Sequence, residues 1–401
     1  MSESLLEHVD GHYYAVDTWV RLPRLLAAQG AQVTLWAPVR NGRVVPTGES
    51  WRVDLGDMRV EHHDPYARYG AYYRLWPRRV LAWRRRAARL IAAHDVVLVR
   101  LPSPMMSLVT ALVNRAAKPL VLVVAGDSLA QSDRIRASRG LARLAYRWAV
   151  RWLVGQERRC ARRASLVYAY SRELEERHHG SGVPVLRMRT PHLRLGDLVE
   201  REDTCGGDEV RLLRVCWLLP SKGIEPLLDA VALLRARGRR VRLEIVGKAR
   251  EPGYLDTLRA RARALALEGV VTFIGWVPFD RMREVYLRSD VQVISSYAEG
   301  TPRCIVEGAA HGVPLVSTAA GGCAEALEQE RTALLVPVGD APALAAAVER
   351  VVDDGDLRRS LIAEGYRLAR GATFETIGVK LLDDLERLMR RADDDAVAAR
   401  G

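Results

Sequence analysis

Residues 295–318 read SSYAEGTPRCIVEGAAHGVPLVST, and their pattern decides the fold of the second half of the chain. An apolar strand ends at Ser295-Ser296 and leads into a loop with Glu299-Gly300. A helix is then predicted with Thr301 as its N-cap and Pro302 as its first residue, because these residue types favour those positions. A strand that runs through a glycine loop into a helix places free backbone N–H groups at the carboxyl edge of a parallel sheet. The stretch therefore predicts a site for an anionic ligand such as a diphosphate.

Two carboxylates flank the start of this predicted helix, which ends at Gly312. Glu299 precedes the helix, and Glu307 lies about a turn and a half inside it. This spacing lets the two carboxylates contact different parts of one elongated ligand. Taken alone, it also fits a charged loop residue followed by an ordinary helix residue, so the surrounding motifs have to distinguish the two interpretations.

Short apolar runs without strict alternation recur along the chain, which is typical of strands covered on both faces. Between them lie segments with helical apolar spacing, such as residues 18–30 and 107–117. The predicted strands are residues 31–37, 95–101, 118–125, 165–170 and 184–188 in the first half, and 212–219, 241–247, 270–274, 290–296, 313–318 and 333–336 in the second. This alternation predicts an α/β architecture with two doubly wound, Rossmann-like domains in tandem.

Composition places the boundaries of these domains. The stretch LGDLVEREDTCGGDE (195–209) is polar, acidic and without periodic pattern, and it is predicted to link them. We therefore expect a first domain at residues 1–195, a linker at 196–209 and a second domain at 210–373. The opening strand is poorly marked, because only SLLEHV precedes Asp10-Gly11, so either this strand is short or the chain begins late.

Length and composition exclude several classes of protein. The chain has 401 residues, enough for about two domains, and its hydrophobic content of 49% supports two packed cores. No apolar run approaches the roughly 18 to 20 residues that span a bilayer, and the N-terminus lacks a secretory pattern, so a soluble, cytoplasmic protein is expected. The five cysteines form no C-x-x-C pair and have no histidines at zinc-ligand spacing, so buried thiols are expected.

Positive charge is concentrated in the first half of the chain. Residues 1–200 contain 32 Lys and Arg against 18 Asp and Glu, a net charge of +14, whereas residues 201–401 contain 29 against 31, a net charge of −2. Two basic amphipathic stretches, 76–94 and 140–163, fit interfacial helices on anionic lipid, and they equally fit surface helices packed on a sheet. No helix-turn-helix, zinc or RNP signature accompanies the charge, so nucleic acid is not an expected partner.

The motifs around residues 295–318 extend into a longer ordered set. The run YAEGTPRCIVEGAAHGVPLVSTAAGGCAEALEQERTALLVPVGD (297–340), with LLPSKGIEPLLDAVALL upstream, LEIVG at 243–247 and VVTFIGWV at 270–277, resembles the donor domain of retaining, family 4-type (group 1) glycosyltransferases. The resemblance is dense over residues 212–374 and weak over the N-terminal half. It implies the GT-B fold, in which two Rossmann-like domains face each other across the active-site cleft. It also implies that the last helix, residues 374–391, crosses back to the first domain.

The resemblance assigns roles to the predicted site. Glu299 would contact the hydroxyls of the donor sugar, and Glu307 the ribose of the nucleotide. Lys222 resembles the lysine that pairs with the diphosphate, and an ammonium group after a strand end would in any case neutralise a leaving phosphate. The loop against the sugar and diphosphate, and the strand ends that line the base pocket, correspond to Gly300, Thr301, Pro302, Gly247 and Gly275. As isolated residues, the strand-end glycines also fit ordinary turns.

The chain departs from the family at two places. Cys216-Trp217 stands where the family has Gly-Arg, so the second diphosphate cation is missing there, and Arg303 is the candidate to replace it. Ala125 stands where many relatives have a histidine near the acceptor. The polar candidates on the acceptor side are then Asp127, as a catalytic residue, and the loop Asp10-Gly11-His12.

The resemblance and the residues together predict a retaining glycosyltransferase. It would move a sugar from a nucleoside diphosphate-sugar to an acceptor sugar, a lipid-linked glycan or a natural product. No cofactor and no catalytic metal are expected, since a cation and a helix N-terminus stabilise the leaving diphosphate in GT-B relatives. Two alternatives stay open: a catalytically impaired sugar-nucleotide-binding partner subunit, and a GT-B sugar-nucleotide epimerase. Any membrane contact is expected to be peripheral, at the inner face of an anionic membrane.

Overall fold

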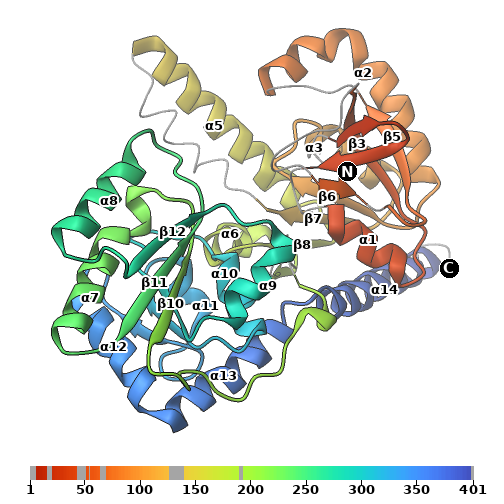
Figure 1. Ribbon diagram of the computed structural model, residues 1–401. Helices are drawn as coiled ribbons and strands as arrows, with labels where there is room; N and C mark the ends of the chain where they lie inside the picture. The colour runs from red at the N-terminus through yellow and green to blue at the C-terminus, as the bar shows by residue number, and fades with distance from the viewer. Residues whose placement is uncertain are drawn as a thin grey trace. The chain divides into compact units, whose positions relative to one another are not determined.

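A computed structural model describes residues 6–15, 20–42, 51–53, 55–63, 69–125, 140–188 and 193–398 (Figure 1). The chain divides into two compact units. One comprises Met1–Pro191 with Ile377–Gly401, and the other comprises His192–Thr376. Each unit has strands and helices around hydrophobic clusters of its own.

The second unit is built on a six-stranded parallel sheet. Its strands are β10 (Val210–Val215), β11 (Val241–Val246), β12 (Val271–Gly275), β13 (Val291–Ile294), β14 (Leu315–Thr318) and β15 (Leu334–Val336). Their spatial order, β12-β11-β10-β13-β14-β15, is the 3-2-1-4-5-6 order of a Rossmann fold. All six strands predicted for this half are present. The direction of strand addition reverses between β10 and β13, and this reversal defines the switch point of the sheet.

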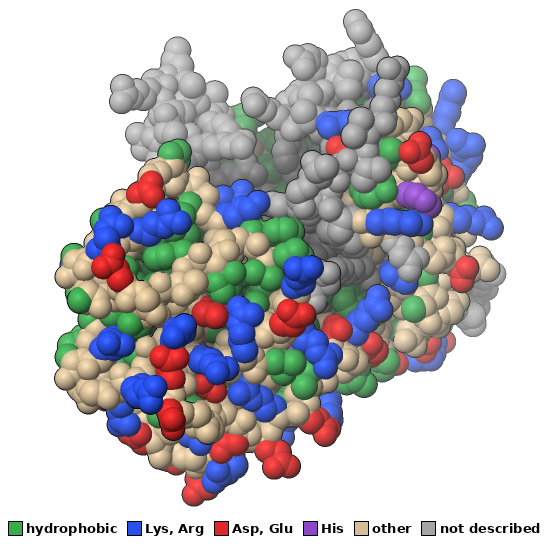
Figure 2. Space-filling model, viewed as in Figure 1, with side chains coloured by type: hydrophobic (Ala, Val, Ile, Leu, Met, Phe, Trp, Pro, Cys, Tyr) green, Lys and Arg blue, Asp and Glu red, His purple; other side chains and the backbone are tan. Residues whose placement is uncertain are grey.

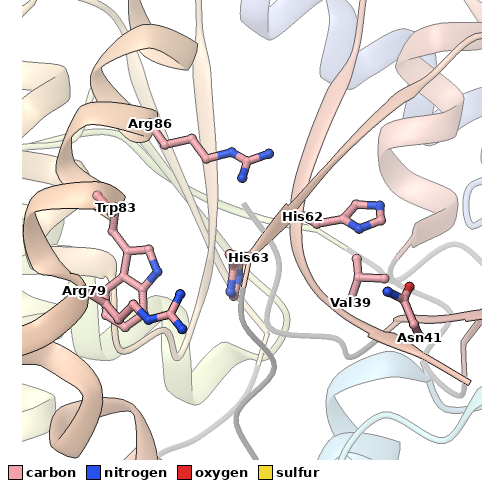
Figure 3. A pocket seen from close by; sticks show the side chains of 8 residues that line it. Val39, Asn41, His62, His63, Arg79, Trp83 and Arg86 are labelled. Atoms are coloured by element: carbon pink, nitrogen blue, oxygen red, sulfur yellow. The ribbon is translucent and has the colours of Figure 1, made fainter.

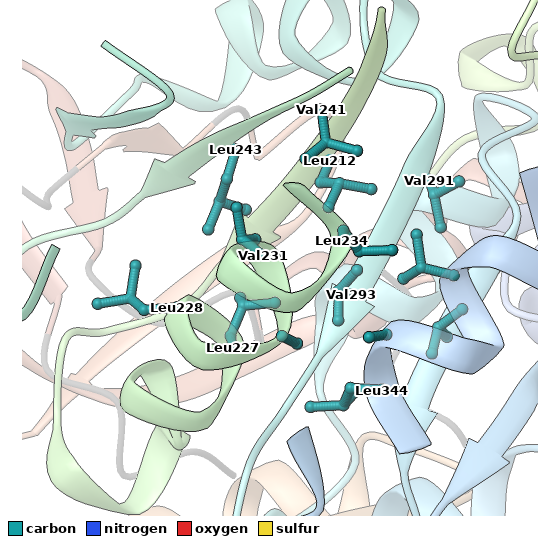
Figure 4. Close-up of a cluster of buried hydrophobic side chains, with 14 of the residues drawn as sticks. Leu212, Leu227, Leu228, Val231, Leu234, Val241, Leu243, Val291, Val293 and Leu344 are labelled. Carbon is teal, nitrogen blue, oxygen red and sulfur yellow. The ribbon is translucent and has the colours of Figure 1, made fainter. Parts of the chain in front are cut away.

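Helices pack on both faces of this sheet. They are α7 (Ile224–Ala236), α8 (Tyr254–Ala264), α9 (Phe279–Leu287), α10 (Arg303–Ala310), α11 (Gly322–Ala326), α12 (Ala341–Asp353) and α13 (Gly355–Arg370). Leu212 of β10 is buried with Leu227 and Leu344 of α7 and α12 (Figure 4), whereas the next residue, Leu213, is buried with Met282 of α9. Successive residues of a strand point to opposite faces, so both faces of β10 are covered, as its unbroken apolar run predicted.

The predicted linker is part of the second unit. Asp203 accepts hydrogen bonds from Arg358 Nε at 2.5 Å and from Arg359 Nη1 at 3.1 Å. Arg201 Nη1 donates to the carbonyl oxygens of Leu287 and Ser289. The segment 196–209, predicted as the interdomain linker, is thus attached to α9 and α13 by its polar groups.

The first unit contains a four-stranded parallel sheet with the order β6-β7-β8-β9. Its strands are β6 (Val97–Leu101), β7 (Leu120–Val124), β8 (Leu166–Ala169) and β9 (Val185–Arg187), and the helices that follow them along the chain are α3 (Met106–Arg115), α5 (Gly140–Ala161) and α6 (Arg172–His178). Helix α14 (Phe374–Ala398) buries Leu381 and Leu385 in this unit, and Tyr168 Oη donates a 2.6 Å hydrogen bond to Asp384.

A second sheet of the first unit has the order β4-β2-β1-β3-β5. Its strands are β1 (Leu6–Val9), β2 (His12–Ala15), β3 (Thr34–Asn41), β4 (Trp51–Val53) and β5 (Arg59–His63), and α1 (Arg21–Ala28) and α2 (Tyr69–Ala92) accompany them. Asp10 and Gly11 have φ values of 48° and 78° and form the tight turn of an antiparallel hairpin. The sequence analysis expected a loop here and missed β2, although Asp-Gly is the residue pair that such turns favour.

The two basic stretches both pack an apolar face on the core. Trp83, Ala87 and Ile91 of α2 are buried, as are Cys160 and Ala161 of α5. Each helix also exposes apolar residues, with Leu81 of α2 at 65% and Leu144 and Trp148 of α5 at 65% and 69%. Lys and Arg side chains are interspersed with Asp and Glu over the visible face of the second unit (Figure 2), as its near-zero net charge predicts.

All five cysteines are free, and the expectation of buried thiols holds for three of them, whereas Cys205 and Cys216 are only partly buried. Cys160, Cys304 and Cys323 are buried, and burial raises the pKa of Cys323 to about 11.

Candidate functional site

The candidate site lies at the switch point of the second unit. Lys222 follows β10, and Glu299 follows β13, the two strands between which the sheet order reverses. Lys222 Nζ lies 2.7 Å from Glu299 Oε2, and the two side chains are only 18% and 9% exposed. Open α/β sheets bind ligands beyond the carboxyl ends of their strands at this point. The structure thus brings together two residues that the sequence placed 77 positions apart.

Backbone contacts hold the Lys222 turn against the Glu299 loop. The turn Pro220–Lys222 is followed by Gly223 at φ 57°, where a Cβ atom would lie 2.0 Å from the Ser295 carbonyl oxygen. The Tyr297 amide donates to the Ser221 carbonyl oxygen at 2.9 Å. Gly223 therefore permits both the left-handed turn and the close approach that places the lysine beside the glutamate.

A buried arginine supports this pair, and the sequence analysis missed it. Arg214 on β10 is 0% exposed. Its Nη2 donates to Ser296 Oγ at 2.7 Å and to the Lys222 carbonyl oxygen at 3.2 Å, and it lies 3.8 Å from Glu299 Oε1. Ser296 Oγ in turn donates to Glu299 Oε1 at 2.7 Å. A charged residue within an otherwise apolar predicted strand was the available signal, because arginine is almost never fully buried without a partner.

A second glycine loop supports the Glu299 loop from the other side. The Gly322 amide donates to the Glu299 carbonyl oxygen at 3.0 Å. A Cβ atom at Gly322 would lie 1.9 Å from the Gly300 carbonyl oxygen, and one at Gly321 would lie 2.5 Å from the Glu299 carbonyl oxygen. Gly321-Gly322 lies within the motif quoted above, but the sequence analysis gave these residues no role. Only glycine allows the two loops to approach this closely.

Helix α10 begins one residue later than predicted. Pro302 is its N-cap, with an extended ψ of 130°, and the helix starts at Arg303. The prediction that Thr301 caps the helix is wrong, because the extended proline places Thr301 outside the cap and no side-chain cap bond forms. The first turn is closed by the Ile305 amide, which donates to the Pro302 carbonyl oxygen at 3.2 Å. Amides at the start of a helix lack partners within it, so the helix start retains its capacity to bind an anion.

Glu307 lies inside α10 in an apolar setting. Tyr286 Oη donates to Glu307 Oε2 at 3.0 Å, and the Tyr286 ring stacks on His311 with a centroid distance of 5.2 Å. Burial raises the pKa of the Glu307 carboxyl group, although the charge of the exposed Arg303 and the tyrosine hydrogen bond act in the opposite direction. In this structure the charge of Arg303, the predicted diphosphate cation, thus lowers the pKa of Glu307.

Trp217 follows β10 by two residues, and its ring contacts the guanidinium group of Arg250. Arg250 Cζ lies 3.6 Å from the centroid of the Trp217 ring. The two strand ends also meet closely, because a Cβ atom at Gly247 would lie 1.7 Å from the Cys216 carbonyl oxygen, and the Gly247 amide donates to the Gly275 carbonyl oxygen at 2.8 Å. The sequence analysis did not consider Arg250, although it follows Gly247 by three residues.

The acceptor-side candidates belong to the first unit. Asp10 and Gly11 form the hairpin turn described above, and His12 Nδ1 lies 3.1 Å from Arg52 Nη2. Asp127 lies outside the described residues. In the parts of the chain that the structure covers, no three His, Cys, Asp or Glu side chains group closely enough to hold a metal ion. No helix within those same ranges is long and apolar enough to cross a bilayer.

A comparison with known protein families matches most of the second unit. Residues 205–368 match the family described as "Glycosyl transferases group 1". Residues 205–368 are a group 1 glycosyltransferase domain. This domain contains Lys222, Glu299 and Glu307, so the resemblance seen in the sequence is confirmed.

Similar proteins are glycosyltransferases of several kinds. The lipopolysaccharide core biosynthesis glycosyltransferase LpsE of Rhizobium meliloti is 35% identical over 150 residues, 37% of this chain and 42% of the relative. The D-inositol 3-phosphate glycosyltransferase of Corynebacterium aurimucosum is 34% identical over 143 residues, 35% of this chain and 34% of the relative. A GDP-mannose-dependent alpha-(1-6)-phosphatidylinositol monomannoside mannosyltransferase of Mycobacterium tuberculosis is 28% identical over 198 residues, 47% of this chain and 49% of the relative. The chain thus spans about a third to a half of the length of these relatives.

Solved structures establish the fold around the group 1 domain. Anabaena HepE in complex with UDP and glucose has a TM-score of 0.62 at 17% identity, over 96% of this chain and all of that chain. Sucrose-phosphate synthase from Thermosynechococcus elongatus has a TM-score of 0.64 at 19% identity, over 92% of both chains. The chain has the GT-B fold of these proteins, which confirms the predicted fold class.

Proposed function

We propose that the protein is a retaining glycosyltransferase that moves a sugar from a nucleoside diphosphate-sugar to an acceptor without a cofactor or a catalytic metal. The observation that carries this proposal is the shielded Lys222–Glu299 pair at the switch point, next to the start of α10. A cation, a carboxylate and a helix N-terminus at one sheet edge supply what a sugar diphosphate requires.

The Lys222–Glu299 pair does not have to open for the donor to bind. An ammonium group has three N–H donors, and Glu299 uses one of them, so the others can donate to the diphosphate oxygens. Each oxygen of the Glu299 carboxylate accepts one hydrogen bond, from Ser296 or from Lys222, and retains a lone pair for a sugar hydroxyl. Glu307, held by Tyr286, is the carboxylate for the ribose hydroxyls.

Transfer requires negative charge to be stabilised on the leaving diphosphate. Lys222 and the α10 amides would take this role, because donors fixed in a shielded site stabilise developing charge without reorganisation. In retaining transfer the acceptor hydroxyl approaches the face of the sugar that the diphosphate leaves. The diphosphate oxygen can then accept the acceptor proton, so the donor side needs no protein base.

The acceptor we propose is a sugar, a lipid-linked glycan or a natural product, and a lipid-linked glycan is favoured. Two of the relatives are named for lipopolysaccharide core biosynthesis and for a phosphatidylinositol mannoside. Helix α5 exposes Leu144, Trp148 and Trp152 at four-residue intervals. Arg147 and Arg151 are exposed within the same stretch. Exposed tryptophans beside arginines fit the interface of an anionic membrane, so we propose peripheral contact through this stripe.

A panel of nucleoside diphosphates in a thermal-shift assay tests donor binding. A nucleotide that binds the native state raises the apparent stability by RT ln(1 + [L]/Kd). Release or transfer of sugar from the matching nucleotide sugar then tests catalysis, and proton NMR of the new anomeric centre tests retention. Lys222→Ala is expected to lower kcat by roughly 10²- to 10³-fold. Donor binding without any sugar release, across a broad acceptor panel, would support the non-catalytic partner subunit instead.

Vesicle flotation tests the membrane stripe. Wild-type protein should float with anionic vesicles at low salt, float less as salt rises, and lose most binding in Trp148→Ser. Leu81→Ser on α2 is the matched control, because Leu81 is 65% exposed and lies outside the stripe. Equal flotation with neutral and anionic vesicles would contradict the proposal.

A further inference from the structure

A pocket of about 320 Å³ lies within the first unit, at the carboxyl ends of β3 and β5 (Figure 3). Helix α2 forms its other wall. It is lined by Val39, Asn41, His62, His63, Arg79, Ala82, Trp83 and Arg86. Small-molecule sites occupy about 300 to 1,000 Å³, so this pocket suits one sugar-sized group rather than a glycan chain.

The lining is rich in positive charge and in hydrogen-bond donors. Arg79 and Arg86 lie two turns apart on α2, with Trp83 between them, and Figure 3 shows both guanidinium groups directed from the helix toward the strand of His62 and His63. Among the lining residues that the structure describes there is no aspartate or glutamate. Such a lining matches an anion, and guanidinium groups match the geometry of phosphate in particular.

Glu61 neutralises part of this charge without occupying all of Arg86. Nε and Nη2 of Arg86 both donate to Glu61 Oε2, with Nε at 3.0 Å. Nη1 of Arg86 has no hydrogen-bond partner among the residues that the structure describes. An arginine has five N–H donors, so Arg86 can contact an anion while it keeps its ion pair. Arg86 therefore keeps donors for a ligand anion beside its ion pair with Glu61.

Contacts within the first unit fix the histidines before any ligand arrives. His62 Nε2 lies 2.7 Å from Tyr13 Oη, and the His63 ring meets the buried Trp36 edge-on at 5.6 Å. His63 is only 7% exposed. A rigid wall opposite the two arginines lowers the entropic cost of ordering side chains around a small ligand.

We propose that this pocket binds the phosphate group of a phosphorylated sugar or polyol, either free or as a lipid headgroup. The ligand's role as acceptor rests on the proposed function, but its binding does not require that function. The pocket therefore selects an acceptor by the phosphate ester that it carries. Arg79 and Arg86 contact the phosphate, and the rest of the lining contacts the attached ring.

Isothermal titration calorimetry with glucose 6-phosphate tests the proposal, and glucose is the uncharged comparison. Glucose 6-phosphate should bind and glucose should not, at low salt and neutral pH. Arg79→Ala should weaken binding by at least about tenfold, as expected for the loss of one charged hydrogen bond. Arg85→Ala is the matched control, because Arg85 is an exposed arginine of the same helix that does not line the pocket.

Glu61→Gln gives a result of opposite sign. Removal of this carboxylate frees Arg86 for the ligand, so glucose 6-phosphate should bind more tightly than to wild type. Flotation with vesicles that contain phosphatidylinositol tests the lipid source. Stronger flotation with phosphatidylinositol than with phosphatidylglycerol vesicles, with the excess lost in Arg79→Ala but not in Arg85→Ala, would assign the headgroup, whereas calorimetric binding without such an excess would assign the free phosphate.

Any one of three results would overturn the proposal. The first is that neither glucose 6-phosphate nor the vesicles bind. The second is that Arg85→Ala weakens binding as much as Arg79→Ala, and the third is that Glu61→Gln weakens binding. Melting curves with a nucleoside diphosphate, whose proposed site is in the other unit, check that each variant is folded. A protein that binds glucose 6-phosphate but never transfers sugar would refute the proposed function and leave the pocket standing.

Discussion

Arg214 Nη2 donates a 2.7 Å hydrogen bond to Ser296 Oγ, and Ser296 donates onward to Glu299 at the same distance. Arg214 is fully buried, and its closest carboxylate oxygen is Oε1 of Glu299, at 3.8 Å. A buried charge is costly unless it is paired and hydrogen-bonded, so this arrangement strongly favours one position of the Glu299 carboxylate. The Glu299 carboxylate, which we propose contacts the donor sugar, is thus held in place by contacts with Arg214, Ser296 and Lys222.

Ser296→Ala is expected to lower kcat by about tenfold and to leave nucleotide affinity nearly unchanged. The substitution removes the hydrogen bond that orients Glu299 and leaves Arg214 with one acceptor fewer. Steady-state kinetics and calorimetry with the nucleoside diphosphate check this separation, and Ser296→Thr should recover turnover. Ser289→Ala is the control, since Ser289 is equally buried but bonds only the Val285 carbonyl oxygen through its hydroxyl. A loss of kcat in both variants would indicate general destabilisation.

Substitutions of Glu299 and Glu307 should affect different measured quantities. Glu307→Ala is expected to weaken binding of the free nucleoside diphosphate, whereas Glu299→Ala should chiefly lower turnover. Each loss of a charged hydrogen bond should cost roughly 1.5 to 3 kcal/mol. Calorimetry with the diphosphate and transfer kinetics measure the two effects. Wild-type values in both variants would refute the site.

Donor affinity should depend on pH through Glu307. Burial raises the pKa of this carboxyl group in the free protein, whereas the charge of Arg303 and the hydrogen bond from Tyr286 lower it. The carbonyl oxygen of Glu307 is also hydrogen-bonded to His311 Nδ1. Ribose hydroxyls donate to the ionised form, so nucleotide affinity should fall as the pH drops through this raised pKa. Because partial burial makes ionisation of this group unfavourable in the folded state, its contribution to folding stability is largest at low pH and is lost as the pH rises through the folded-state pKa.

Glu307→Gln makes these pH effects testable. The variant should melt at a higher temperature than wild type at neutral pH, because a half-buried charge has been removed while the amide still accepts from Tyr286. It should bind the nucleotide more weakly, and its affinity should lose the pH dependence over the weakly acidic range. An unchanged pH profile would show that another group titrates.

Arg250 should strengthen binding of the diphosphate. Its guanidinium group stacks on Trp217, at the place where the family resemblance implied an arginine. Arg250→Ala is expected to weaken binding of a nucleoside diphosphate by about tenfold and binding of the corresponding nucleoside much less. The difference between the two affinities should become smaller at high salt. Arg259→Ala, a 50% exposed arginine on α8, is the control.

Trp217→Arg tests the same point from the other side. The guanidinium group introduced at position 217 and that of Arg250 would then repel each other at the same position, so diphosphate affinity should not rise above that of wild type. Tighter binding in this variant would show instead that Trp217 leaves a cation site vacant.

Gly247→Ala should destabilise the second unit by at least about 3 kcal/mol. The new Cβ atom would lie 1.7 Å from a backbone carbonyl oxygen, and the φ of 140° disfavours any side chain. Gly238→Ala should cost only about 1 to 2 kcal/mol, because its φ is also positive but its surroundings are open. Urea denaturation of both variants measures the difference.

The strands and their unbroken apolar runs were readable in the sequence. All six strands of the second unit lie where their composition predicted, because strands covered by helices on both faces must be apolar throughout. Lys222, Glu299 and Glu307 were predicted as site residues from the motifs and the family resemblance in residues 212–340, and the structure places Lys222 beside Glu299. The β1–β2 hairpin was predictable in principle from Asp10-Gly11, and the cue was overlooked.

Tertiary structure alone decided which side chains meet. Arg214, Ser296 and Gly322 lie on three segments that become neighbours only when β10, β13 and β14 align in one sheet. The pocket of Arg79 and His62 likewise requires α2 to pack beside β5. No local sequence pattern predicts these contacts, because each of the residues is also compatible with an ordinary strand, loop or helix. Their chemistry arises from distance and burial, which the packing of distant segments sets.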